Sequence, residues 1–180
     1  MNILKTQTIA ETKFLNLNLS SYVNKKGDID QWVWVERPNT INAVIIAAMV
    51  GDKLVVIREY RIPIEDYEWG MPAGLVDLGE KPETTVVREL KEETGLEFDT
   101  WKRPISPLVY STAGITNEGV YMAFVNAKGT ISNSGNEATE EIQTFLMDRE
   151  QVKSLLEDPT KKIGAKAYLV FDRFVTFGDV

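Results

Sequence analysis

Residues 74–96 of the chain read GLVDLGEKPETTVVRELKEETGL and combine glycines, one arginine and several glutamates at short spacing. Glu92 and Glu93 follow Glu89 by three and four residues. On an α-helix this spacing places the three carboxylates on one face, where like charges on adjacent turns repel one another. A hard divalent cation would reverse that repulsion, because Mg²⁺ prefers carboxylate and water oxygens. The stretch therefore predicts a helix that carries a metal site.

The complete spacing of this stretch is G-x5-E-x7-R-E-U-x-E-E-x-G-U, where U is a bulky aliphatic residue. Its fixed positions are Gly74, Glu80, Arg88, Glu89, Leu90, Glu92, Glu93, Gly95 and Leu96. A solvated acidic helix face, the usual meaning of a charge run, explains the charges but not the glycines, the arginine and the aliphatic positions together. The pattern resembles the Nudix box, and no fixed position departs from it.

Membership of the Nudix family implies an α/β fold, the Nudix α/β/α sandwich with a mixed sheet, in which the box forms a loop, a helix and a second loop. Strand and helix patterns that alternate along the chain agree with a mixed α/β fold. The resemblance covers the box closely and residues 41–175 loosely. We also expect a small N-terminal antiparallel β-sheet lobe, so that the predicted domains are residues 1–38 and residues 39–180.

Composition limits the possible chemistry. The chain is 43% hydrophobic and 26% charged, as in ordinary globular proteins, and its net charge of −7 argues against a nucleic-acid partner. It contains no cysteine and no histidine, which excludes disulfides, a histidine base and histidine-ligated zinc. It also excludes isomerisation of isoprenoid diphosphates, which on this fold relies on cysteine and histidine ligands. Acid–base work must fall on carboxylates, lysine, tyrosine or water.

The N-terminal residues, MNILKTQTIAETK, lack the apolar core of a signal peptide. The longest apolar run, residues 43–50, is far too short to cross a bilayer. These two features predict a cytoplasmic protein without a membrane partner.

Hydrophobic periodicity predicts the order of the elements. Strands are expected at residues 5–10, 14–20, 31–36, 41–50, 53–60, 101–110, 119–126 and 141–147, and helices at residues 148–156 and 163–174. The box helix should begin at Pro82 and end at Gly95, because proline suits the first helical position and glycine the C-cap. Its buried face should consist of Val86, Val87, Leu90 and Thr94.

The resemblance implies which residues bind metal. Glu89 and Glu93 match the principal ligands of Mg²⁺, or alternatively Mn²⁺, and Glu92 matches an auxiliary, catalytic ligand. The backbone carbonyl of Ala73, which precedes the box glycine, matches a further ligand. Arg88 matches a catalytic-site position, where it either contacts the reacting groups or pairs with a box glutamate to hold the box in shape.

The general base, in the subgroup that this chain resembles, comes from an acidic loop before a late strand. Here that loop is residues 132–141, SNSGNEATEE. We expect Glu140 to be the base, with Glu137 second and Glu141 as a further competitor. A mobile loop that carries the base would close over the substrate and exclude water.

Two signals outside the box indicate the subgroup. Arg58 and Arg61 lie in the run REYR, and residues 72–74 read PAG, which together resemble the ADP-ribose pyrophosphatases and related nucleoside diphosphate sugar hydrolases. In that subgroup, arginines approach the phosphates or the terminal ribose, which suits a guanidinium fork. The alternative is that one of the two arginines is only a surface residue of a strand.

Residues 110–118, YSTAGITNE, resemble a substrate-binding loop of the same subgroup, with Gly114 and Glu118 in register. Ala113 stands where the subgroup has proline, which argues against a strict specificity for ADP-ribose. Glu118 is expected to contact metal, water or sugar, or else to cap the loop.

Trp32 and Trp34 should share one face of a strand near the N-terminus. In related enzymes the N-terminal sheet packs on a second subunit and helps to hold the nucleobase. The resemblance therefore implies a homodimer. Tryptophans at this spacing belong more often to a core or an interface than to a base-stacking site. We expect an interface, with base stacking by one of the two as the alternative.

The resemblance thus predicts a Mg²⁺-dependent enzyme that hydrolyses the pyrophosphate of nucleoside diphosphate sugars, such as ADP-ribose or GDP-mannose. Its products would be a nucleoside monophosphate and a sugar phosphate. One alternative is a pyrophosphohydrolase of nucleoside triphosphates or RNA caps, which the signals outside the box disfavour. Another is a Nudix domain that senses ADP-ribose without catalysis, which the intact box disfavours.

Overall fold

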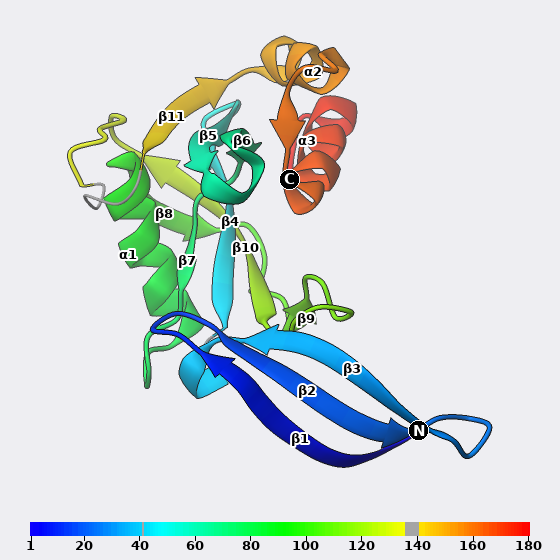
Figure 1. Ribbon diagram of the computed structural model, residues 1–180. Coiled ribbons are helices and arrows are strands. Elements are labelled where there is room, and N and C mark those ends of the chain that lie inside the picture. The colour runs from blue at the N-terminus through cyan, green and yellow to red at the C-terminus, as the bar shows by residue number, and fades with distance from the viewer. Residues whose placement is uncertain (41, 136–140) are drawn as a thin grey trace.

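The structure is a computed structural model and describes residues 1–40, 42–135 and 141–180. The first three strands form an antiparallel sheet of their own, which extends away from the rest of the chain (Figure 1). They are β1 (Asn2–Glu11), β2 (Asn16–Val23) and β3 (Ile29–Glu36). The predicted N-terminal β-sheet is confirmed, although β2 begins and ends later in the sequence than its apolar alternation indicated. The division into two domains at residue 38 stays a prediction.

The other strands form a nine-stranded mixed sheet, with the main order β12-β6-β5-β4-β10-β8. They are β4 (Ala43–Val50), β5 (Lys53–Arg61), β6 (Asp66–Gly70), β7 (Ala73–Leu75), β8 (Glu97–Trp101), β9 (Val109–Tyr110), β10 (Gly119–Lys128), β11 (Ile142–Met147) and β12 (Lys162–Ile163). Strands β4 and β10 are parallel, as are β6 and β12. Three α-helices, α1 (Pro82–Thr94), α2 (Arg149–Glu157) and α3 (Ala165–Phe177), complete the fold.

Two apolar cores lie on opposite faces of the large sheet. On one face, α1 contributes Val86 and Leu90, which pack with alternate side chains of β4 and β10. On the other face, α2 and α3 contribute side chains such as Val152 and Phe171, which pack with the residues of β4 and β5 that point the opposite way. This alternation follows from the two-residue period of strands and gives the three layers of the predicted α/β/α sandwich.

A split between β4 and β5 creates the opening for a site. The two strands pair only at their tight hairpin, through Met49 with Leu54 and Val50 with Lys53. Beyond the hairpin, β7 pairs with β4, while β6 and β11 flank β5 (Figure 1). The strands are therefore closely packed at one end and separate at the other, where the segment that leads into the box enters the sheet.

Three sequence-based expectations about elements are wrong. A continuous strand over residues 101–110 does not form, because Pro104 and Pro107 lack the N–H that a ladder needs, and only β8 and β9 border this segment. Val87 is 44% exposed, since it lies one position beside the buried stripe of α1. The last helix begins at Ala165, because residues 162–163 pair with β6.

Within the part of the chain that the structure describes, no helix is both long enough and apolar enough to cross a membrane.

Candidate active site

Helix α1 places the box glutamates, and its ends form as the sequence predicts. Lys81 is the N-cap, Pro82 occupies the first turn, and Gly95 forms the C-cap at φ 73° with its N–H donating to the Lys91 carbonyl at 2.9 Å. Val86 and Leu90 are fully buried under the helix. The buried stripe fixes the rotation of α1, so that the glutamates point toward the β7 segment.

The backbone of β7 lies directly against the first of these glutamates. A Cβ atom added at Gly74 would lie 1.9 Å from Cδ of Glu89, so only glycine leaves room for this carboxylate. Glu93 is 5% exposed and accepts a hydrogen bond from the Ala73 N–H at 3.0 Å. From the other side, the Thr144 hydroxyl donates to the Glu93 carbonyl at 3.0 Å. Three elements, α1, β7 and β11, therefore meet at these two glutamates.

Arg88 holds the carboxylates of the box together. Its Nη1 lies 2.6 Å from Oε1 of Glu89 and 3.1 Å from Oε2 of Glu92, and its Nη2 lies 3.1 Å from Oε2 of Glu80. Nη2 also donates to the Leu75 carbonyl at 3.1 Å. The hydrogen bond with Glu80 is the main cause that raises the pKa of Arg88 and lowers the pKa of Glu80. Arg88 is therefore a fixed positive charge among the glutamates.

The donor set suits a hard cation, because Glu89, Glu92, Glu93 and the Ala73 carbonyl all offer oxygen. Within residues 1–40, 42–135 and 141–180, no three or more acidic side chains are placed so that together they could hold a metal ion. The guanidinium of Arg88 pairs with two of these carboxylates, Glu89 and Glu92. The oxygen donors therefore fit a divalent cation in their chemistry. In this structure the guanidinium of Arg88 provides the positive charge between Glu89 and Glu92.

A cleft of about 570 Å³ opens beside these carboxylates. Its lining includes five residues of the box, Gly74, Arg88, Glu89, Glu92 and Glu93. Other parts of the chain contribute Arg37, Ile45, Glu59, Arg61, Ser111, Glu118 and Lys166. Acidic and basic side chains thus line a single opening. This arrangement suits a ligand with negative phosphates that is bound through both cations and bridging metal.

Of the two arginines in the REYR run, one lines the cleft and the other does not. Arg61 lines it, and its guanidinium contacts Glu59 at 2.5 Å and Glu68 at 3.2 Å. Arg58 lies 3.8 Å from the centre of the Tyr67 ring and donates to Gln143 at 3.5 Å. The difference follows from the strand period, because residues three apart on β5 point to opposite faces.

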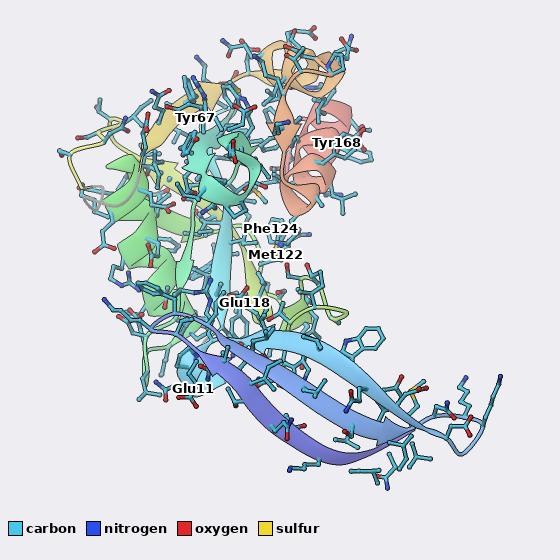
Figure 2. The ribbon with its side chains drawn as sticks, in the orientation of Figure 1. Glu11, Tyr67, Glu118, Met122, Phe124 and Tyr168 are labelled. Carbon is cyan, nitrogen blue, oxygen red and sulfur yellow. The ribbon has the colours of Figure 1, made fainter. Side chains whose placement is uncertain are left out.

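Glu118 lies between the N-terminal sheet and the large sheet, at the edge of the cleft (Figure 2). Its Oε1 accepts a hydrogen bond from Nε of Arg37 at 2.6 Å. The Val35 N–H donates to the Ile115 carbonyl at 2.8 Å, so the loop that holds Glu118 is also joined to β3 by its backbone. The structure therefore places Glu118 in the cleft that the box carboxylates also line, and the ion pair with Arg37 holds it there.

The two tryptophans line a second pocket, of about 320 Å³, on the same loop. Nε1 of Trp32 donates to the Gly114 carbonyl at 3.1 Å, and Nε1 of Trp34 donates to Oγ of Ser20 at 2.9 Å. Tyr110 completes the aromatic lining. The indole donors are therefore bound within the chain, and the ring surfaces are what the pocket offers to a ligand.

The predicted bases Glu140 and Glu137 lie outside the described residues. Glu141 is described, and its carboxylate accepts a hydrogen bond from the Tyr67 hydroxyl, which raises the pKa of that phenol. Ile142, the next residue, pairs with Glu59 of the cleft wall. The acidic loop therefore rejoins the described chain beside the cleft.

Two cations of the cleft were absent from the sequence-based prediction. Arg37 pairs with Glu118, 81 residues away, and Nζ of Lys166 donates to Oγ of Ser111, 55 residues away, at 2.7 Å. Neither residue belongs to a short motif, so the spacing of neighbouring residues does not indicate that Arg37 or Lys166 lies in the cleft. The only signal was position, since Arg37 precedes the Pro38 boundary and Lys166 opens the last helix.

Comparisons with known proteins identify the family of this chain. The profile of the NUDIX domain matches residues 38–169. The ADP compounds hydrolase NudE of Escherichia coli (strain K12) is 48% identical over 59 residues, which are 33% of this chain and 32% of that protein. The ADP-sugar pyrophosphatase of Mus musculus is 25% identical over 143 residues, 74% of this chain and 64% of that protein. The chain thus spans about a third to two thirds of these relatives.

A solved crystal structure of an ADP compounds hydrolase has the same fold, with a TM-score of 0.74 and 22% sequence identity. The superposition covers 97% of this chain and 94% of that one, so it includes the N-terminal sheet as well as the sandwich. Since the NUDIX match covers well over half of the chain and includes the whole box, this protein belongs to the NUDIX family.

Proposed function

We propose that the protein hydrolyses the pyrophosphate bond of nucleoside diphosphate sugars and releases a nucleoside monophosphate and a sugar phosphate. The observation that carries the proposal is the cleft, which the box carboxylates line together with Arg37, Arg61 and Lys166. The similarity to an ADP-sugar pyrophosphatase supports ADP-ribose, itself an ADP-sugar, as the first substrate to test. GDP-mannose is the second.

We further propose Mg²⁺, with Mn²⁺ as the alternative, as the cation that Glu89, Glu92, Glu93 and the Ala73 carbonyl would hold. When bound, such an ion neutralises phosphate charge and activates water. The oxygen donors and the close fit of Glu89 against Gly74 support this assignment. Arg88, which already bridges Glu89 and Glu92, keeps the glutamates at fixed spacing before the substrate enters.

For the proton transfer we propose Glu140 as the general base, and Glu137 as the second candidate. The support is the position of β11, which begins beside the cleft wall at Ile142. Glu141 is the weaker candidate, because its carboxylate is engaged by the Tyr67 hydroxyl. Either of the first two would need to reach the attacking water directly or through a second water.

The substrate contacts that we propose lie on both sides of the box. Arg61 binds a phosphate, while Gly114 and Glu118 border the nucleoside end, where the aromatic pocket of Trp32 and Trp34 would stack a base. Arg58 does not line the cleft, so the proposal rests on Arg61.

We also propose that the protein is a homodimer through its N-terminal sheet. Leu17 pairs with Val35 and Leu19 with Val33, so these four apolar side chains share one face, and Val33 is 53% exposed. A contiguous apolar face of this kind is typical of an interface. The cytoplasmic location stays a prediction.

The decisive experiment is a phosphate-release assay coupled to phosphatase, with Mg²⁺ or Mn²⁺. The substrates are ADP-ribose, GDP-mannose, UDP-glucose, dinucleoside polyphosphates and nucleoside triphosphates. Glu93→Gln should lower kcat by about a hundredfold or more, because a cation ligand is lost. Glu150→Gln, an exposed change on α2, is the matched control and should retain activity. Turnover of triphosphates alone would favour the alternative pyrophosphohydrolase, and ADP-ribose binding without turnover would favour a sensor.

A further inference from the structure

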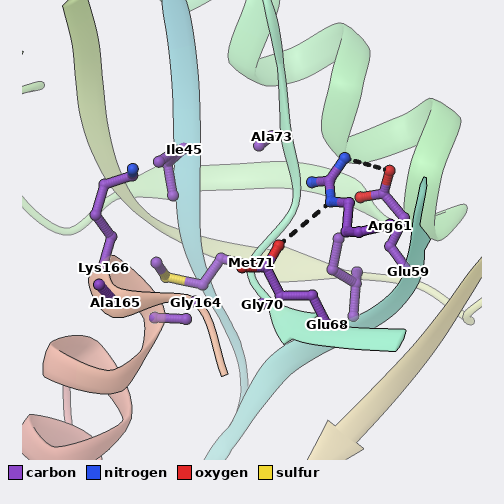
Figure 3. Close-up of a pocket in the computed structure, with 12 residues that line it drawn as sticks. Ile45, Glu59, Arg61, Glu68, Gly70, Met71, Ala73, Gly164, Ala165 and Lys166 are labelled. Carbon is purple, nitrogen blue, oxygen red and sulfur yellow. Dashed lines mark hydrogen bonds and ion pairs between the residues drawn. The ribbon is translucent and has the colours of Figure 1, made fainter. Parts of the chain in front are cut away.

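A pocket of about 190 Å³ adjoins the cleft on the side of β6 and the N-terminal end of α3 (Figure 3). Pocket and cleft share five lining residues, Ile45, Glu59, Arg61, Ala73 and Lys166, so that one opens into the other. The proposed function assigns the cleft to the diphosphate and the aromatic pocket to the base. This third space has no role in it.

One wall of the pocket consists of paired charges. Arg61 lies between Glu59, at 2.5 Å, and Glu68, at 3.2 Å, as the dashed lines in Figure 3 show. The contact with Arg61 uses Oε2 of Glu68, whereas Oε1 lies toward Gly164, where an added Cβ would be 2.9 Å away. A carboxylate with several acceptor positions, fixed by a guanidinium, is a suitable partner for hydroxyl groups.

The rest of the pocket is kept open by short side chains. Gly70 lies two residues after Glu68 on β6, so both positions face the same side of the strand. A Cβ added at Gly70 would meet no atom within 4 Å, and its φ lies outside the left-handed region. A side chain at this position would therefore occupy the pocket without strain in the backbone.

Lys166 stands at the mouth of the pocket, on the opposite side from Arg61 and with Met71 between them (Figure 3). It lines both the pocket and the cleft, and its Nζ donates to Oγ of Ser111 at 2.7 Å. A cation at the junction of the two spaces is placed to contact the phosphate that lies between them.

We propose that this pocket is the subsite for the terminal sugar, with Glu68 accepting hydrogen bonds from its hydroxyl groups. The inference rests on the proposed hydrolysis of nucleoside diphosphate sugars and names the part of the chain that selects the sugar. At about 190 Å³ the pocket has room for a small ring.

The test compares two substrates that differ only beyond the diphosphate, namely ADP-ribose and the methyl ester of ADP at its terminal phosphate. In Gly70→Val, the ratio of kcat/KM for ADP-ribose over the methyl ester should fall about tenfold or more, because added bulk excludes the ring. In Glu68→Gln the same ratio should fall about fivefold, because a charged acceptor becomes neutral. Lys166→Met should lower both kcat/KM values by a similar factor and leave the ratio unchanged.

Binding gives an independent measurement that does not depend on turnover. ADP-ribose in which a methylene replaces the bridging oxygen is titrated into each variant by calorimetry. Gly70→Val should bind it about tenfold more weakly than wild type. Lys153→Met and Glu157→Gln, two exposed changes on α2, are the matched controls, and thermal unfolding shows that each variant is folded.

The possible outcomes separate the two proposals. Wild type that cleaves both diphosphates, with an unchanged ratio in Gly70→Val and Glu68→Gln, would overturn the sugar subsite and leave the proposed function intact. Wild type that cleaves neither would overturn the proposed function, and the subsite with it. A ratio that falls in both pocket variants but not in the controls is the expected result.

Discussion

At the scale of single residues, Gly74 is the position where the site tolerates least change. Its missing side chain is the space that the Glu89 carboxylate fills, at 1.9 Å from an added Cβ. Gly74→Ala must therefore displace either the β7 backbone or Glu89. Since a 1 Å misplacement costs about a hundredfold in rate, kcat/KM for ADP-ribose should fall by about that factor.

For Gly74→Ala, the loss of kcat/KM has to be compared with any loss of thermal stability. A steady-state assay with thermal unfolding on the same samples distinguishes a misplaced ligand from an unfolded protein. Ser154→Ala, on the exposed side of α2, serves as the control that leaves both quantities unchanged. Wild-type kcat/KM in Gly74→Ala would show that the close fit with Glu89 has no catalytic role.

Sequence predicts residues of the site well where they are neighbours along the chain. Arg88, Glu89, Glu92 and Glu93 all lie on α1, so helical geometry alone brings them together. Gly74 lies on β7, and the fold places it against Glu89. Arg37 and Lys166 reach the cleft through contacts that span 81 and 55 residues, and only the folded sheet sets those distances. Alternation along β5 could have shown that Arg58 and Arg61 face opposite sides.

At the scale of elements, α1 offers a direct comparison of buried and exposed positions. Val86 is fully buried, whereas the adjacent Val87 is 44% exposed. Val86→Ala should lower the free energy of unfolding by about 2 kcal/mol, from lost burial and the cavity that remains. Val87→Ala, with the same chemistry, should change it by less than about 0.5 kcal/mol.

Urea unfolding of the two alanine variants, with wild type beside them, measures this difference. Equal losses for Val86→Ala and Val87→Ala would contradict the orientation of α1, and with it the placement of the glutamates. The helix illustrates what the sequence could establish about elements, since Pro82 and Gly95 fix its ends by local chemistry. It could not distinguish Val86 from Val87, because both lie near the apolar stripe until the neighbouring strands are known.

The C-terminal segment after α3 provides a prediction about pH. Lys102 lies 2.6 Å from Asp179, and this hydrogen bond holds the pKa of the Asp179 carboxyl below its ordinary value. A lowered pKa means that the pair stabilises the fold above about pH 4 and that this contribution is lost as the pH falls further. Because Asp179 is half exposed, the contribution should be at most about 1 kcal/mol.

Lys102→Met should therefore be less stable than wild type at pH 7, and the difference in unfolding free energy should shrink toward pH 3. Urea titrations at several pH values measure it, and Lys128→Met, an exposed lysine paired with Asp99, is the control. A difference that stays constant through the acid range would show that Lys102 acts by packing rather than by its charge.

At the scale of the whole molecule, the fold places three cavities next to one another: the aromatic pocket, the cleft and the smaller pocket. The aromatic pocket adjoins the loop of Glu118, the cleft holds the box carboxylates, and the smaller pocket lies behind Arg61 and Lys166. The N-terminal sheet and residues 110–117 line the first space together, and the large sheet and its helices supply most of the lining of the other two. Sequence motifs predicted the middle of this series, while its two ends depend on how distant segments pack.

The N-terminal sheet also carries the last prediction, which concerns assembly. Its face with Leu17, Leu19, Val33 and Val35 is apolar, and Val33 is 53% exposed in the single chain. If this face is the interface of a homodimer, a buried charge would cost several kcal/mol, which is enough to separate the subunits. Val33→Glu should therefore be monomeric where wild type is dimeric.

Sedimentation equilibrium at micromolar concentration measures the mass of each species. Lys26→Glu, which changes charge in the exposed turn after β2, is the control and should remain dimeric. A monomeric wild type would overturn the homodimer, and a dimeric Val33→Glu would place the interface elsewhere. Trp32 neighbours Val33 on the opposite face of β3, so the interface and the base pocket adjoin. A monomeric Val33→Glu whose KM for ADP-ribose rises, with unchanged thermal unfolding, would therefore show that the second subunit supports the base pocket.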